Sequence, residues 1–180
     1  MKLFDPTLVP QGHVPRVFVL QLRQDDPKKC TAAKMVKFRL AQPLFRIRQI
    51  PRRALVLNPF ASEVLLNGHR DDANHFGLVA IDCSWEKVEG AFASRLPGRS
   101  VRLPTFLAAN PVNYAKQHKL SSLEALAASL YIMGFQEKAK QLLSLFKWAP
   151  NFLSLNQNPL DAYATAKSEQ EITDLEAQFF

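Results

Sequence analysis

Cysteine is scarce in this 180-residue chain, which carries only Cys30 and Cys83. So few thiols exclude a disulfide framework and a cysteine-rich zinc site. The four histidines are scattered, and no pair has the i, i+4 spacing of a zinc-binding helix. We therefore expect no metal site.

The sequence also lacks the glycine patterns of several enzyme classes. There is no GxGxxG, no GxxxxGK[ST] and no GxSxG, which argues against a Rossmann dinucleotide site, a P-loop and a hydrolase nucleophile elbow. No apolar run approaches the roughly 18 residues of a membrane span, so we expect none. The first twelve residues do not have the pattern of a signal peptide. With two thiols and no export signal, we expect a cytoplasmic protein.

Positive charge is concentrated in one part of the chain. Residues 1–53 hold 12 Lys and Arg against 3 Asp and Glu, whereas residues 54–180 hold 11 against 13. Such a basic region suggests a polyanion such as nucleic acid, although a merely solvated surface has the same composition. The candidate phosphate contacts are Lys28, Lys29, Arg46, Arg48, Arg52 and Arg53.

The hydrophobic pattern changes character near residue 103. Up to that point short apolar runs alternate with helical segments, which predicts an α/β fold with a mostly parallel sheet. The expected strands cover residues 16–22, 44–50, 54–57, 76–81 and 100–103, with helices at 31–42 and 84–96. Beyond it the pattern is helical only, with helices at 122–133, 136–146, 160–166 and 169–179. We therefore expect an N-terminal α/β domain (1–103), a C-terminal all-helical lobe (104–180) and a ligand crevice between them.

The most informative stretch runs from Ile81 to Trp85. An apolar run stops at Asp82 and is followed by a helix-starting serine, as at a strand end that faces a ligand. Asp82 is then a general base, a hydrogen-bond acceptor for a ligand, or the N-cap of the following helix. Trp85 is either a core residue or a flat apolar wall for a planar ring.

Two further segments have both a binding and a structural interpretation. The segment Ala108 to Tyr114 is either a rigid loop whose amides face a ligand or a turn in which Asn and Pro set the backbone. Thr31 offers a hydroxyl and a helix-terminal amide to a carboxylate, or it is simply a helix cap.

These blocks together resemble the ribosome-biogenesis aminocarboxypropyltransferases that modify small-subunit ribosomal RNA. The likeness covers residues 16–165, and the DCSW and AANPVNY blocks carry most of its specificity. The matching blocks, in chain order, are Asp26 to Thr31, Leu57-Asn58-Pro59, Asp82-Cys83-Ser84-Trp85, Arg102-Leu103-Pro104, Ala108 to Tyr114, Leu123-Glu124-Ala125, Phe146-Lys147-Trp148 and Phe152 to Asn156.

The resemblance implies a SPOUT-like fold with a deep trefoil knot, followed by the helical lobe. It implies S-adenosylmethionine as cofactor and transfer of its 3-amino-3-carboxypropyl group to N3 of an N1-methylpseudouridine. The partner would be small-subunit rRNA or a pre-ribosomal particle, with no membrane contact. A helical lobe that covers the usual SPOUT dimer surface favours a monomer. The alternatives are a SPOUT-type rRNA methyltransferase and a non-catalytic RNA-binding assembly factor.

The resemblance also assigns roles to individual residues. Asp82 would lie near the reacting carbon, and the Ile81 carbonyl would hold the ribose. Thr31 and the amide of Ser122 would hold the cofactor carboxylate, and the backbone at Leu103 and His118 would bind the adenine edge. The apolar contacts to adenine would be Leu57, Pro59, Trp85, Leu103, Leu120 and Ala125.

Two positions depart from the pattern of that family. Asn58 stands where a serine is common, and Ala115 stands where glycine is common.

Overall fold

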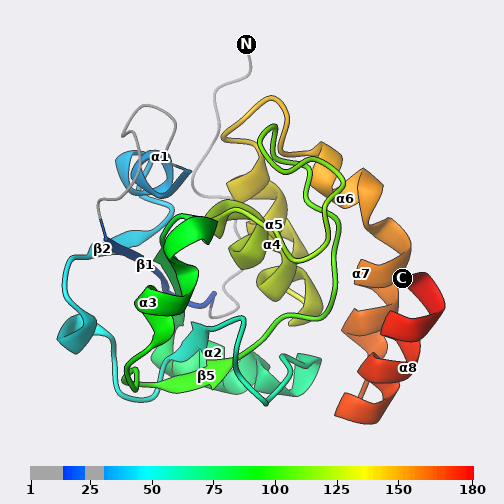
Figure 1. Cartoon of the computed structure of the whole chain (residues 1–180), viewed down its shortest axis with the longest axis horizontal. Coiled ribbons are helices and arrows are strands. Elements are labelled where there is room, and N and C mark those ends of the chain that lie inside the picture. The colour runs from blue at the N-terminus through cyan, green and yellow to red at the C-terminus, as the bar shows by residue number, and fades with distance from the viewer. Residues whose placement is uncertain (1–13, 23–30) are drawn as a thin grey trace.

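A computed structural model describes residues 14–22 and 31–180 of the chain (Figure 1). Five parallel strands form one sheet in the order β2-β1-β4-β3-β5. The strands are β1 (Val17–Gln21), β2 (Gln42–Leu44), β3 (Leu55–Leu57), β4 (Leu78–Asp82) and β5 (Arg99–Val101). The central strands are short apolar runs buried on both faces, as parallel sheets require. The predicted α/β class and parallel sheet are confirmed.

Alternate residues of each strand belong to two separate hydrophobic clusters. Val19 and Ala80 face a large cluster that also contains Met35 of α1 (Thr31–Lys37) and Ala73 of α2 (Arg70–Phe76). Leu20 and Ile81 face a smaller one, against which the helix α3 (Val88–Phe92) and the 3₁₀ helix η1 (Ile47–Gln49) pack. Two more 3₁₀ helices, η2 (Asn67–His69) and η3 (Trp85–Lys87), precede α2 and α3. The sheet is therefore covered on both sides.

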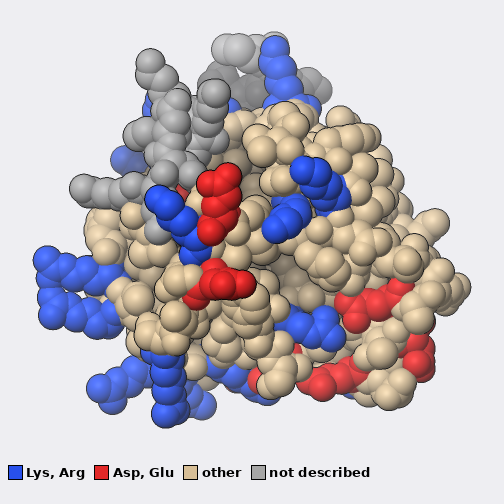
Figure 2. Space-filling view, in the orientation of Figure 1, with Lys and Arg blue, Asp and Glu red and all other residues tan. Residues whose placement is uncertain are grey.

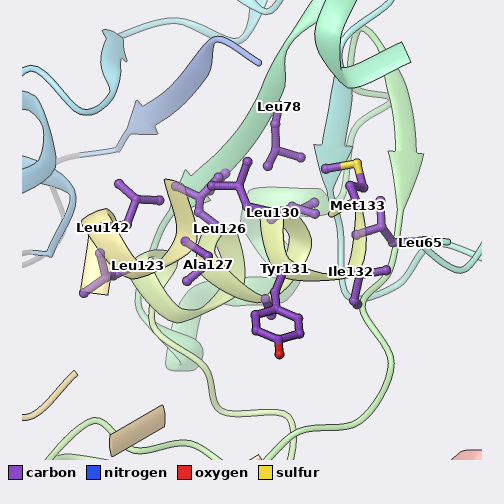
Figure 3. Close-up of a cluster of buried hydrophobic side chains, with 14 of the residues drawn as sticks. Leu65, Leu78, Leu123, Leu126, Ala127, Leu130, Tyr131, Ile132, Met133 and Leu142 are labelled. Carbon is purple, nitrogen blue, oxygen red and sulfur yellow. The ribbon is translucent and has the colours of Figure 1, made fainter. Parts of the chain in front are cut away.

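Helix α4 (Ser122–Ile132) is the centre of the larger core. Its side chains Leu126 and Leu130 lie towards Leu78 of β4, whereas Tyr131 points to the other side (Figure 3). There the Tyr131 hydroxyl donates a hydrogen bond to Asp161 at 2.5 Å. The helix is apolar nearly all round because it lies between the sheet and an outer layer of helices.

The outer helices are α5 (Gln136–Leu143), α6 (Asn151–Leu155), α7 (Gln157–Thr165) and α8 (Glu169–Phe179). The segment between β5 and α4 runs along α6 and α7 before it returns to α4 (Figure 1). The buried Asn156 side chain holds it there, since its amide accepts from the Leu107 N–H at 2.8 Å and donates to the Leu107 carbonyl at 2.9 Å. The predicted helical character of the C-terminal part is confirmed from Ser122 onwards, whereas residues 104–121 form no helix. The division into domains 1–103 and 104–180 stays a prediction.

Several predicted elements differ from the structure. The helices expected over 31–42 and 136–146 end earlier, at Lys37 and Leu143. The expected strand over 44–50 is wrong, because β2 ends at Leu44 and η1 follows. The Gln49 side chain accepts hydrogen bonds from the N–H groups of Phe45 and Arg46, at 2.8 and 2.9 Å, and so folds the segment into a turn. The expected helix over 84–96 is shorter, because helical structure ends at Phe92.

Within residues 14–22 and 31–180, no helix combines the length and apolar character needed to cross a bilayer.

Candidate functional site at the carboxyl edge of the sheet

The strand order reverses direction between β1 and β4. The chain leaves β1 through α1 towards β2, but it leaves β4 through α3 towards β5 on the opposite side. The last residues of the two strands, Gln21 and Asp82, are register partners. In open α/β sheets a ligand crevice forms outside the carboxyl ends of the strands at such a point. The topology therefore places Asp82 at the position where a ligand site is expected.

Asp82 faces the start of α4. The Ser122 hydroxyl donates a hydrogen bond to Asp82 Oδ1 at 2.7 Å, which joins the end of β4 to the first turn of α4. The N-cap of the following 3₁₀ helix is Ser84, so the N-cap interpretation of Asp82 is wrong. The carboxylate is instead an acceptor at the border between sheet and helical lobe.

Trp85 forms a second link across the same border. Its indole Nε1 donates to the Leu120 carbonyl at 3.0 Å, and Lys119 Nζ lies 4.7 Å from the ring centroid. The side chain is half-buried and belongs to neither core cluster of the described residues. The structure therefore favours the wall interpretation of Trp85 over a core role.

The apolar residues named for the site come from both sides of this border. Leu57 and Ile81 are buried at strand ends, and Pro59 is exposed in the turn after β3. Leu103, Leu120 and Ala125 are partly buried against the larger core. Neither Leu57 nor Pro59 forms a ring contact or hydrogen bond with Trp85. The three residues are grouped here because they all lie at the carboxyl edge of the sheet.

Two named residues lie at the margin. Thr31 is half-buried and opens α1, the helix that follows β1. The strand order puts this helix start at the carboxyl edge of the sheet. His118 is exposed, with a φ of +56°, and its N–H donates to the Phe106 carbonyl at 3.4 Å.

The chief supporting residue of the site is Glu124, which sequence reasoning did not single out. Its fully buried carboxylate accepts five hydrogen bonds of 2.6 to 3.0 Å. The donors are the Ala109 and Asn110 N–H groups, the Asn110 side-chain amide, and the N–H and hydroxyl of Ser121. The Ser121-x-x-Glu124 spacing is a capping-box signal, but it does not reveal the contacts to residues 109 and 110.

The segment Ala108 to Tyr114 is shaped by its own side chains. Asn110 is buried, donates to the Lys119 carbonyl at 3.0 Å and accepts from the Asn113 N–H at 3.0 Å. These bonds favour the turn interpretation for Asn110. Ala115 has a φ of +61°, in the left-handed region that glycine adopts without strain.

Asn58 likewise supports a turn at the site. Its side-chain oxygen accepts from the Phe60 N–H at 2.9 Å, just after β3 ends. A serine hydroxyl can make the same local bond, which explains how either residue type serves at this position.

The basic candidates are divided among several places. Arg46 and Arg48 are exposed at η1, while Arg52 and Arg53 precede β3, at the end of the sheet opposite to Asp82. Arg52 and Arg53 line a hollow of about 320 Å³ there, which is therefore not part of the site at Asp82.

Figure 2 shows Lys and Arg side chains along the left and lower margins of the molecule, and acidic ones over α7 and α8. Lys28 and Lys29 lie outside the described residues.

Among the described side chains, no group of three or more His, Cys, Asp or Glu is placed to hold a metal ion.

Two family models match the chain. The model described as "Ribosome biogenesis protein, C-terminal" covers residues 55–180. The other, "Possible Fer4-like domain in RNase L inhibitor, RLI", covers residues 15–44. Iron–sulfur clusters are held by several cysteine thiolates, and this second range contains only Cys30. It therefore cannot supply the ligands of such a cluster by itself.

Curated relatives and a solved structure match along nearly the whole chain. The 16S rRNA aminocarboxypropyltransferase of Methanosarcina acetivorans is 42% identical over 91% of this chain and 93% of its own length. That of Methanopyrus kandleri is 43% identical over 91% and 97%. The SAM-dependent rRNA:acp-transferase Tsr3 from Vulcanisaeta distributa superposes with a TM-score of 0.83 at 39% identity, covering 91% of this chain and 95% of that one. The chain belongs to the 16S rRNA aminocarboxypropyltransferase family.

Proposed function

We propose that this protein transfers the 3-amino-3-carboxypropyl group of S-adenosylmethionine to N3 of an N1-methylpseudouridine in small-subunit rRNA during ribosome biogenesis. The observation that carries the proposal is the border at which Asp82 meets Ser122 and Trp85 meets Leu120. It combines a carboxylate with a flat apolar wall, at the switch point of the sheet, in a chain related to enzymes named for this transfer.

The residues at this border fit the adenosine part of the cofactor. Trp85 is half-buried rather than enclosed, so its ring has a surface for a planar base. Leu103, Leu120 and Ala125 are partly buried on the side of the helical lobe, and Leu57 and Pro59 belong to the side of the sheet. Few polar groups and several apolar walls are typical of sites for flat heterocycles. The backbone at Leu103 and His118 would bind the adenine edge, and the Ile81 carbonyl the ribose.

The amino-acid arm of the cofactor needs partners of another kind. Thr31 opens α1, and Ser122 lies in the first turn of α4. Backbone N–H groups in a first helical turn have no carbonyl partner within the helix and suit a carboxylate. The Ser122 hydroxyl is already used by Asp82, so its amide is the group we assign to this role.

Asp82 is the residue that we assign to proton transfer. It accepts a hydrogen bond from Ser122, which holds the carboxylate in place while its oxygens remain acceptors. In this role it would accept or orient the N3 proton of the uracil ring, and a positioned base contributes about 10²–10⁴-fold. When bound, S-adenosylmethionine would supply the electrophilic carbon of the aminocarboxypropyl arm, and the neutral thioether 5′-methylthioadenosine would leave as the bond from that carbon to sulfur breaks. The apolar walls would select this arm by holding the methyl substituent towards the protein, because orientation decides which carbon lies in line with N3.

We also propose the finer architecture that accompanies this activity. It comprises a SPOUT-like fold with a deep trefoil knot, lobes 1–103 and 104–180, a monomeric state and a cytoplasmic location. The packing of α4 between the sheet and the outer helices supports the monomer, since the helical lobe then covers one sheet face.

Mass spectrometry of small-subunit rRNA from cells without this protein tests the proposal. We expect one uridine derivative to lose its aminocarboxypropyl group, wild-type protein to restore it, and Asp82→Asn to restore at most a few per cent, because the amide is a poor proton acceptor. Ribosomal RNA of unchanged mass would contradict the transfer and favour the assembly-factor alternative.

A further inference from the structure

A second basic hollow lies at the amino edge of the sheet, beside the starts of β1 and β2. It has a volume of about 230 Å³. Its charged lining residues are Arg16, Arg39 and Lys138, from the start of β1, the end of α1 and the start of α5, and no acidic residue lines it. Arg39 and Lys138 therefore bring positive charge from two helices to one concave surface, and Arg16 lines it from the start of β1 while its guanidinium lies 5.7 Å from the centroid of the Phe18 ring.

Lys138 is poorly placed for a cation without a ligand. Burial lowers the pKa of its ammonium group, so part of the side chain has left water. It also lies in the first turn of α5 (Gln136–Leu143), where the helix dipole disfavours positive charge. Among the residues that the structure describes, none of the three basic side chains of the hollow forms an ion pair with a carboxylate. An anion in the hollow would compensate each of these unfavourable features.

Arg39 occupies a backbone position at which a different residue type is expected. Its φ is +58°, just after the end of α1. The Leu40 N–H donates to the Met35 carbonyl and the Arg39 N–H to the Val36 carbonyl, at 2.9 and 3.0 Å. This is the helix-ending geometry that glycine or asparagine usually adopts. Arg39 therefore holds a strained backbone conformation at the rim of the hollow, as residues at ligand sites can do.

An exposed aromatic residue precedes Arg39 in the chain. Phe38 is 54% exposed and stands between Lys37 and Arg39. Surfaces that bind single-stranded RNA combine cations for the phosphates with aromatic rings on which bases stack. The sequence Lys37-Phe38-Arg39 beside the hollow has this composition.

We propose that the hollow lined by Arg39 and Lys138, beside Arg16, binds a backbone phosphate of the substrate RNA, with Phe38 stacking on a neighbouring unpaired base. The proposal rests on rRNA being the substrate. The register of β1 and β4 puts the hollow and Asp82 at opposite ends of the sheet, about 17 Å apart for a five-residue strand. The hollow is thus a remote anchor, which binds RNA without touching the reacting uridine.

The test is RNA binding measured over a range of salt concentrations. A fragment of small-subunit rRNA that contains the acceptor uridine is titrated with wild type, Lys138→Gln, Arg16→Gln and Arg39→Gly. Loss of one phosphate contact should reduce the slope of log affinity against log salt by about one unit. Lys167→Gln is the matched control, because this lysine is exposed between α7 and α8 beside acidic residues and should leave the slope unchanged.

Substitutions at two positions separate binding from a structural role. Arg39→Gly removes backbone strain, so it should raise the thermal midpoint while lowering RNA affinity; a structural role alone predicts no loss of affinity. Phe38→Ala should weaken RNA binding about tenfold with an unchanged salt slope, and Phe38→Tyr should restore it.

The transfer reaction distinguishes this proposal from the proposed function. The hollow variants should raise KM for RNA several-fold and leave kcat unchanged, because they do not touch the reacting groups. Slopes and KM values equal to those of Lys167→Gln would overturn the proposal even if transfer to rRNA is normal. A shift of the Lys138 and Arg39 amide signals with inorganic phosphate, combined with unaltered RNA slopes, would identify a free-phosphate site and overturn the RNA assignment.

Discussion

Replacing Trp85 with alanine is expected to weaken S-adenosylmethionine binding by about 10- to 100-fold. The estimate follows from aromatic stacking on a base, which contributes about 1–3 kcal/mol by alanine substitution. The change also removes the hydrogen bond from the indole to the Leu120 carbonyl, which joins η3 to the segment before α4. Isothermal titration calorimetry with the cofactor measures the effect.

Trp85→Phe is the matched control for this prediction. It keeps a flat ring but lacks the indole N–H, so it should recover most of the affinity if stacking dominates. Because Trp85 lies outside both core clusters of the described residues, we expect little change in the thermal midpoint for either variant. An unchanged dissociation constant for Trp85→Ala would mean that the adenine does not lie against this ring.

Replacing Glu124 with alanine is expected to lower the free energy of unfolding by about 3–5 kcal/mol. The buried carboxylate accepts five hydrogen bonds, and its removal leaves the N–H groups of Ala109 and Asn110 without their acceptor. Each unsatisfied buried donor costs about 1–3 kcal/mol, and bonds to a charged acceptor lie at the upper end. For a chain of this size the thermal midpoint should fall by about 10 °C.

The control for this prediction is Glu137→Ala. Glu137 also lies near a helix start, but its side chain is exposed and pairs with Lys140 of the same helix. Exposed pairs of this kind contribute little, so the midpoint should move by less than about 2 °C. Chemical or thermal unfolding followed by circular dichroism compares the two variants. Equal stability of Glu124→Ala and Glu137→Ala would contradict the supporting role of Glu124.

Much of the fold is predictable because local patterns agree with it. The strands β1 and β4 are apolar runs between residues that interrupt regular structure. Helix α4 begins after its N-cap Ser121 and ends before Gly134, as the capping signals in the sequence predict. The segment 44–50 is different, because its alternating pattern favours a strand whereas the Gln49 side chain folds it into a turn. A single side chain that captures nearby backbone groups can override periodicity.

The candidate site is only partly predictable for a related reason. The position of Asp82 can be predicted from the sequence, because an apolar strand pattern ends at this polar residue. Its hydrogen bond to Ser122 joins residues 40 positions apart, and Glu124 reaches back 15 positions to Ala109. Periodicity and capping signals describe neighbours in the chain, so contacts of this range depend on tertiary packing, which they do not contain.

The proposed activity differs from methyl transfer in the substituent that moves from the sulfonium to the RNA. The most direct test incubates the protein and a small-subunit rRNA fragment with S-adenosylmethionine labelled on the methyl group in one reaction and on the carboxyl group in another. We predict carboxyl label in the RNA and no methyl label. Methyl label in the RNA would contradict the account and identify a methyltransferase instead.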